Sequence, residues 1–187
     1  MDDDLRTREQ IGRALLASER DVANFFTSLS SDALSLRVGS AWAALEQLEH
    51  LNSSVGAVAK GFAAPKLLLR LRFGRAKERG RSYTQLRDEY RARLAAGGRA
   101  SGAFVPKPPD ASTASIESRR GDQLERWHRR NGRLRRAVNS WSEAQLDTMQ
   151  LPHPLLGSIT AREMLYFTIY HAEHHVAATK RRLPRFS

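Results

Sequence analysis

The segment IYHAEHHVAATK, residues 169–180, holds three of the six histidines of the chain. Residues four apart lie on the same face of a helix, so His171 and His175 would lie one above the other. Two imidazoles at this spacing can bind one metal ion through bonds of about 2.1 Å. His174 would point roughly 80° away from them, which predicts a position at the rim. A hydrogen-bonded pair in a helical core would have the same spacing, so the pair alone leaves both interpretations open.

A third candidate ligand is His50, which lies far earlier in the chain. Its predicted helix face carries small or polar residues: Ala43, Glu46, Ser54, Ala57 and Gly61. Such a face leaves room for a cavity, an ion and a substrate. Glu46, one turn earlier, is a candidate catalytic base or a hydrogen-bond partner of a ligand, although a surface carboxylate near arginines would look the same. His128 lies in an arginine run and is predicted to be solvated, whereas the prolines around His153 predict a conformational role.

The elements that would position these residues are helices. Ala, Leu, Arg, Glu and Gln are common, and no segment shows the alternation of β-branched residues that is typical of a strand. Thr160 followed by Glu163 is typical of a capping box. The sequence therefore predicts an all-α four-helix bundle. Apolar residues at helical spacing place its long helices at about 5–29, 40–62, 115–140 and 160–183.

Residues 63–114 form an elaborated connection between the second and third of these helices. Short helices are predicted in APKLLLRLRFG and in SYTQLRDEYRARLAAGG, and SGAFVPKPPDAS is predicted to be a proline-rich loop. We interpret the connection as part of the bundle, so residues 1–187 are expected to form a single domain. The segment QLPHPLLGSIT, which precedes the last helix, is predicted to be a loop.

The composition limits the classes of protein to consider. Cysteine is absent, so a metal site must use His, Asp or Glu. No apolar run could span a bilayer and the acidic start MDDDLRTREQ is not a secretory signal, which predicts a cytoplasmic protein with no membrane partner. The net charge of +11 is concentrated in 66–99 and 119–136. Solvated arginine-rich helix faces explain this charge better than a nucleic-acid surface, because interleaved aromatic residues and glycine-rich loops are missing there.

Two segments resemble the DinB-like superfamily. Trp42 lies eight residues before the pair His50–Leu51, like the W…HL signature of that superfamily's second helix. LPHPLLGSITAREMLYFTIYHAEHHVAATK is similar to its C-terminal segment, with an HP-x-x-G loop, a capped helix start and an H-x-x-x-H motif. The resemblance covers about 40–62 and 140–183. It implies a four-helix bundle in which three histidines hold a divalent cation, usually zinc or nickel: His50, His171 and His175.

The resemblance also implies an activity. Characterised relatives include S-transferases and isomerases that use low-molecular-weight thiols, many others are described as metal-dependent hydrolases, and members often form dimers. A hydrolase and a thiol transferase, each acting on a small-molecule substrate, stay equally open. The anionic groups of a thiol would account for the arginines of 66–81 or 119–136. The alternative is a non-catalytic, metal-stabilised binding module whose basic faces bind nucleic acid or an acidic partner. A histidine cluster that binds no metal is a third, weaker alternative.

Overall fold

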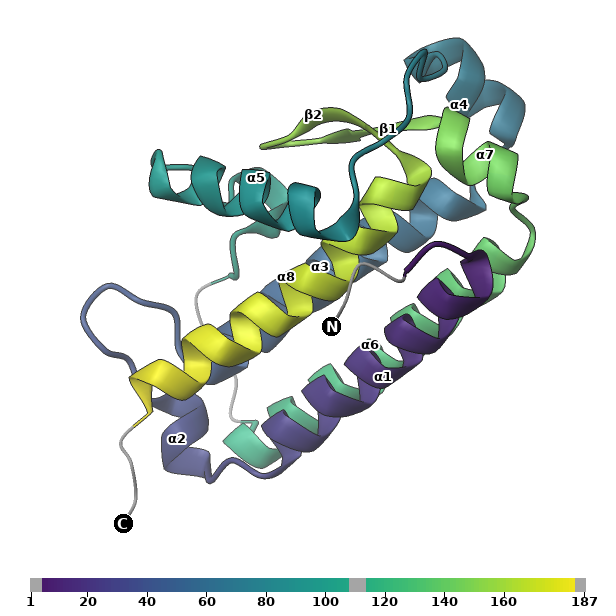
Figure 1. The fold of residues 1–187 in the computed structure, drawn as a ribbon. Coiled ribbons are helices and arrows are strands. Elements are labelled where there is room, and N and C mark those ends of the chain that lie inside the picture. Colours follow the sequence, from purple (N-terminus) through teal and green to yellow (C-terminus); the bar gives the residue numbers. More distant parts are fainter. Residues whose placement is uncertain (1–4, 108–113, 184–187) are drawn as a thin grey trace.

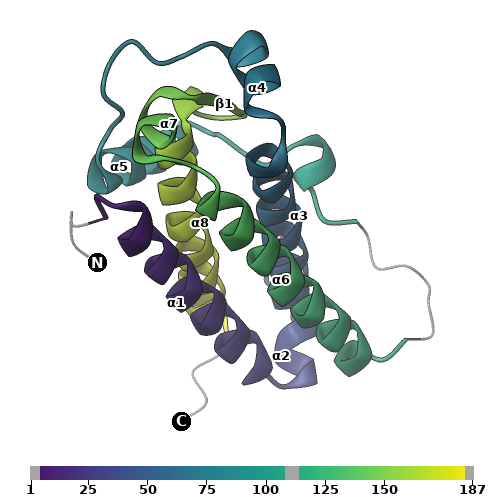
Figure 2. The same cartoon turned by 90° about the vertical axis from the view of Figure 1, so that its right-hand side faces the viewer.

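The computed structural model describes residues 5–107 and 114–183, and its four longest helices form a bundle (Figure 1). These helices are α1 (Arg8–Thr27), α3 (Ala44–Ala63), α6 (Ile116–Asn139) and α8 (Ala161–Arg182). Helices α1 and α3 each pack against both α6 and α8, and Figure 2 shows the four side by side. The predicted all-α bundle is confirmed.

The bundle core is built from the apolar stripes of the long helices. Trp127 and Trp141 are among its largest fully buried side chains. The indole N–H of Trp127 donates to the carbonyl of Glu19 in α1, and that of Trp141 donates to the carbonyl of Phe62 in α3, both at 3.0 Å. Buried indoles need such acceptors. Trp127, within α6, therefore bonds to α1, and Trp141, two residues after the end of α6, bonds to α3.

The helix starts follow their capping residues. The Thr160 hydroxyl accepts the backbone N–H of Glu163, whose carboxylate accepts the N–H of Thr160, so the predicted capping box of α8 is confirmed. The predicted start of α3 near Ser40 is wrong. Ala43 precedes the first turn and offers no side-chain acceptor, and the Glu46 carboxylate accepts the Ala43 N–H at 2.8 Å instead. The helix therefore begins at the position where the Glu46 carboxylate can accept the N–H of the residue before the first turn.

The long connection contains α4 (Lys66–Phe73), α5 (Tyr83–Ala95) and the short 3₁₀ turn η1 (Gly102–Phe104). Both predicted short helices are confirmed. The predicted proline-rich loop includes η1, while its residues 108–112 lie outside the described part of the chain. Helix α5 packs against α8, and η1 packs against α3. The connection therefore covers the side of the bundle where α3 and α8 meet.

Two short helices and one hairpin complete the described structure. Helix α2 (Ser31–Ser35) lies at one end of the bundle and α7 (Glu143–Thr148) at the other (Figure 1). The prediction of a loop before α8 is wrong, because strands β1 (Gln150–His153) and β2 (Gly157–Thr160) form an antiparallel hairpin. Leu151 pairs with Ile159, and both side chains are buried. Each strand has four residues, too few for an alternation of polar and apolar residues to reveal it.

Candidate metal centre

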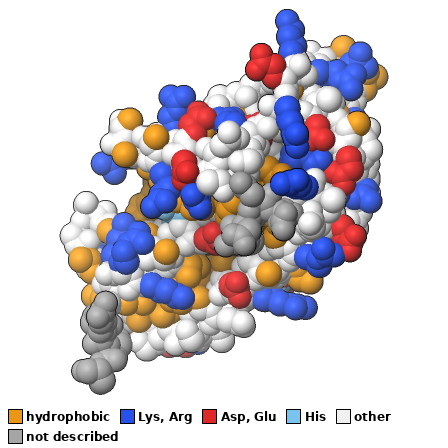
Figure 3. All heavy atoms as spheres, in the orientation of Figure 1, with side chains coloured by type: hydrophobic (Ala, Val, Ile, Leu, Met, Phe, Trp, Pro, Cys, Tyr) orange, Lys and Arg blue, Asp and Glu red, His pale blue; other side chains and the backbone are white. Residues whose placement is uncertain are grey.

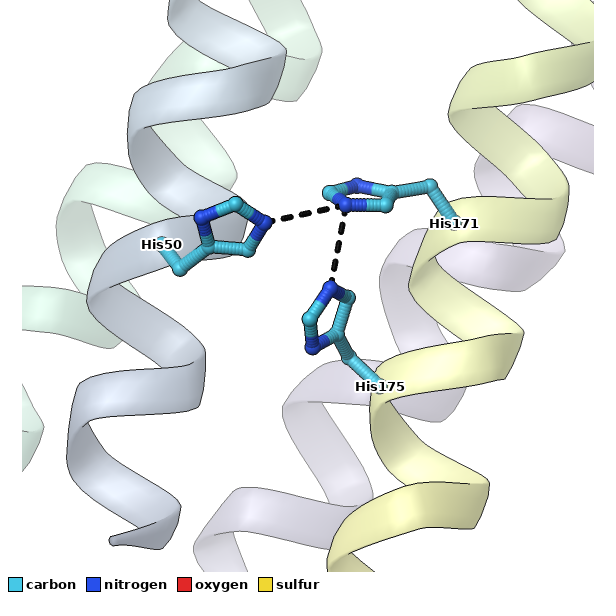
Figure 4. Close-up of side chains that lie close together, drawn as sticks. All are labelled: His50, His171 and His175. Atoms are coloured by element: carbon cyan, nitrogen blue, oxygen red, sulfur yellow. Dashed lines mark hydrogen bonds between the residues drawn. The ribbon is translucent and has the colours of Figure 1, made fainter. Parts of the chain in front are cut away.

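Three histidines from two helices converge beside the long connection (Figure 4). His50 lies in the first half of α3, and His171 and His175 lie one turn apart on α8. The Nε2 atom of His171 is 3.0 Å from the Nε2 atoms of both His50 and His175. In a tetrahedral site with bonds of about 2.1 Å, ligand nitrogens lie roughly 3.4 Å apart. The three side chains could therefore hold one metal ion with small adjustments.

Hydrogen bonds fix the protonation of two of the rings. The Nδ1 atom of His50 lies 2.6 Å from the backbone carbonyl oxygen of Phe104, and Nδ1 of His175 contacts the side-chain oxygen Oε1 of Gln47. Carbonyl oxygens only accept hydrogen bonds, so both Nδ1 atoms carry the proton. The Nε2 atoms of His50 and His175 then present lone pairs toward His171. Metal-binding histidines are commonly oriented by such contacts to their other ring nitrogen.

Burial keeps the cluster neutral. Removal from water lowers the pKa of His50, although the Phe104 carbonyl opposes this effect. Burial also sets the pKa of His171 and of His175 well below the ordinary value, and neighbouring histidines lower both further. A single N–H on Nε2 of His171 cannot fully satisfy two facing lone pairs at once. A cation at the centre would satisfy all three nitrogens, and neutral imidazole is the form that binds metals.

The other histidines take different positions. His174 does not belong to the converging group, as predicted, although its side chain is half-buried and borders the same space. His153 is buried, and its Nδ1 atom accepts the backbone N–H groups of Leu155 and Leu156 at 3.1 and 3.0 Å, contacts that agree with the predicted conformational role. His128 is about half exposed, yet its Nδ1 atom contacts a Glu19 carboxylate oxygen at 2.8 Å. The prediction of a solvated His128 is therefore only partly right.

Glu46 is positioned by its capping role. Its side chain is buried, one carboxylate oxygen accepts the Ala43 N–H, and the other pairs with Arg37. These contacts do not support the predicted role of Glu46 as a base, which stays a prediction. Its neighbour Gln47 contacts His175 instead. Gln47 lies three residues before His50, and that spacing could have singled it out.

A cavity of about 950 Å³ opens onto the histidine cluster. In Figure 3 pale-blue histidine atoms lie in a hollow between orange apolar side chains, with basic side chains at its edge. The walls come from α3, α4, α5, residues 98–105, the hairpin and α8, and they are mostly apolar. Among the described residues no Asp or Glu lines the cavity. Apolar and aromatic side chains of these elements and of the segment before α3 contribute to the walls: Trp42, Val58, Leu69, Phe73, Tyr90, Leu94, Phe104, Leu151 and Phe167.

Two arginines, Arg99 and Arg182, line the cavity. No described residue of 119–136 does so, and from 66–81 only the apolar Leu69 and Phe73 do. The explanation of the arginines of 66–81 or 119–136 as a binding site for a thiol in this cavity is therefore wrong. The basic residues that could meet an anionic ligand come from the connection after α5, where Arg99 stands alone, and from the last turn of α8, where Arg182 follows Lys180 and Arg181.

The comparisons with known proteins agree with this architecture. The family model described as the DinB superfamily matches residues 14–178, which include all of α3 and α6 and most of α1 and α8. The match also contains the three converging histidines. No curated protein and no solved structure matches the chain.

Proposed function

The chain belongs to the DinB superfamily, and we propose that it is a metal-dependent enzyme that activates a low-molecular-weight thiol or water. His50, His171 and His175 would hold the divalent cation, with zinc or nickel best suited to three imidazoles. The observation that carries the proposal is the convergence of the three Nε2 atoms while hydrogen bonds from Nδ1 orient two of the rings. When bound, the ion would supply Lewis acidity that lowers the pKa of a thiol or of water.

The cavity favours a catalytic site over a structural one. Structural zinc sites are closed by four protein ligands, whereas catalytic sites keep an open position. Among the described residues only three ligand side chains converge, and all three border the cavity. A small molecule in the cavity would therefore have direct access to the fourth position.

Thiol transfer is favoured over hydrolysis by the side chains that line the cavity. Hydrolytic sites commonly use a carboxylate as the base that takes a proton from water. No Asp or Glu among the described residues lines the cavity. A thiol, with an ordinary pKa of about 8.5, ionises far more readily and needs no such base. Arg99 and Arg182 would attract the anionic groups of the thiol or of the second substrate, and the apolar walls would hold an apolar portion.

The test combines metal content with turnover. The purified protein is expected to contain one zinc or nickel ion per chain and to consume a thiol when an electrophile is added. The substitution His171→Ala should abolish both, whereas His128→Ala, on the outer face of α6, should change neither. Substoichiometric metal under replete conditions would contradict the metal site. Full metal content without thiol consumption would contradict thiol transfer and would favour hydrolysis.

The alternative, a non-catalytic module that binds nucleic acid or an acidic partner, predicts a different outcome. Binding to nucleic acid would weaken steeply with salt, and histidine substitutions would lower stability without changing any turnover. The expected homodimer and the cytoplasmic location stay predictions. Size measurement in solution would check the first, and localisation of the tagged chain would check the second.

A further inference from the structure

Helix α4 has two apolar faces, and only one of them packs on the protein. Leu69 is buried and Phe73 is partly buried, and both line the cavity. Leu67, Leu68 and Leu71 lie on the other side, with exposed fractions of 68%, 55% and 76%. These three leucines are the most exposed of the large apolar side chains in the described part of the chain. The bundle core does not need them, so their exposure requires another explanation.

The exposed leucines are surrounded by positive charge. Residues 66–81 contain seven Lys and Arg against a single Glu. Arg70 and Arg72 are exposed on α4 itself, and Lys77 and Arg79 are exposed in the segment that follows. Figure 3 shows blue and orange side chains gathered at the corner of the molecule where Figure 1 draws α4. The helix is thus basic and amphipathic on its outer surface, a pattern typical of membrane-surface helices.

We propose that α4 docks the protein on an anionic lipid surface, with Leu67, Leu68 and Leu71 inserted among the acyl chains and the neighbouring basic residues on the phosphates. An anionic bilayer offers negative charge and an apolar layer within one helix diameter of each other. The attachment is peripheral, since no described helix is long and apolar enough to cross a membrane.

Other occupants fit this surface less well. A second copy of the chain would bring like charges together, and three leucines fall far short of the roughly 800 Å² per partner that a stable interface buries. The phosphates of a nucleic acid would neutralise the arginines but would leave the leucines in water. Of these three occupants, a lipid surface is the one that matches both the charge and the apolar side chains.

Docking through α4 would also place the cavity near the membrane. Leu69 and Phe73 form part of the cavity wall on the inner side of the same helix. The cavity would then lie about one helix diameter, roughly 10 Å, from the lipid surface. This arrangement suits a substrate with a large apolar portion. The docking proposal itself does not depend on the metal or on the proposed reaction.

Vesicle sedimentation of the full chain tests the proposal. The wild-type protein is expected to bind vesicles of phosphatidylcholine with phosphatidylglycerol and to bind pure phosphatidylcholine vesicles roughly tenfold less. The triple substitution Leu67→Ser, Leu68→Ser and Leu71→Ser should weaken binding to the anionic vesicles by roughly tenfold or more. Because these side chains are exposed, the variant should keep the wild-type circular dichroism spectrum and melting temperature.

Two charge variants separate α4 from the other basic surface. Arg70→Glu with Arg72→Glu should abolish vesicle binding, while Arg126→Glu with Arg133→Glu, which makes the same charge change on exposed positions of α6, should preserve it. The proposal is overturned if wild type does not bind anionic vesicles, if the leucine variant binds as well as wild type, or if both charge variants lose binding equally. Conversion of a dimer to a monomer by the leucine substitutions would overturn it in favour of a second copy.

Discussion

At the scale of single residues, the site depends on which atom orients each imidazole. His175 belongs to α8, but the side chain that holds its Nδ1 atom, Gln47, belongs to α3. His50 belongs to α3, and a carbonyl of the long connection, that of Phe104, holds its Nδ1 atom. Each of these two ligands is therefore positioned by an element other than its own helix. Loss of one such contact should weaken metal binding without removing a ligand.

The substitution Gln47→Leu tests this dependence. Leu is similar in size to Gln but offers no acceptor. The Nδ1–H group of His175 would therefore lose its acceptor, the buried side-chain oxygen of Gln47. We expect metal affinity to fall roughly 10- to 100-fold, measured by competition with a chromophoric chelator. The matched variant Gln47→Glu keeps an acceptor oxygen and should bind metal at least as tightly as wild type. Equal affinities for wild type and Gln47→Leu would show that this contact does not orient the ring.

His153 gives a prediction about pH. Burial, together with the nearby charge of Arg81, lowers its pKa to about 4. The unfolded chain, with an ordinary pKa of about 6.5, binds more protons between these values. The free energy of unfolding should therefore fall as the pH decreases from about 6.5 to about 4, by up to ~1.4 kcal/mol per pH unit from this group.

The control for this prediction is His153→Asn, whose side-chain oxygen can accept the N–H groups of Leu155 and Leu156 but does not titrate. Urea unfolding of both proteins, with chelator present, should show a shallower pH dependence for the variant over this range. Parallel curves would mean that His153 titrates normally in the folded protein.

At the scale of the elements, prediction from sequence succeeded where a periodic pattern exists. The four long helices have apolar residues at helical spacing, and this pattern also placed His171 and His175 on one face. The start of α3 was misplaced because Ala43, which precedes its first turn, has no capping side chain. The hairpin was missed because two four-residue strands carry no periodic signal. Phe104 and Arg99 were missed for another reason: their place at the site depends on the path of the long connection, which no local pattern determines.

Gly98 allows a test of the path of the connection, and Gly121 in α6 serves as the control. A Cβ atom added at Gly98 would lie 2.7 Å from the backbone oxygen of Arg93, so Gly98→Ala should displace the segment that leads to Arg99 and Phe104. We expect a loss of ~1–3 kcal/mol in the free energy of unfolding and weaker metal binding. Gly121→Ala, in α6 with open space around it, should instead stabilise the protein by ~0.5–1 kcal/mol. Denaturant unfolding would measure both, and a neutral Gly98→Ala would contradict the tight approach.

At the scale of the whole molecule, the histidine cluster lies where three parts of the structure meet. Helices α3 and α8 supply the imidazoles, and the long connection supplies the Phe104 carbonyl and much of the cavity wall. An ion bound there would join α3 to α8 and would indirectly hold the connection against both. Metal binding and the stability of the entire fold should therefore be coupled.

The coupling predicts how the melting temperature responds to metal. At a free metal concentration of 100 times Kd, binding to the folded state alone stabilises it by ~2.7 kcal/mol, which corresponds to about 5–10 °C for a chain of this size. Calorimetry should show this rise when zinc or nickel is added to the chelator-treated protein. His50→Ala should abolish the rise, because it removes the ligand that α3 is proposed to supply, whereas His128→Ala on α6 should retain it. If the His50→Ala variant showed the same rise as wild type, the metal would be binding elsewhere and α3 would not be joined to α8 through it.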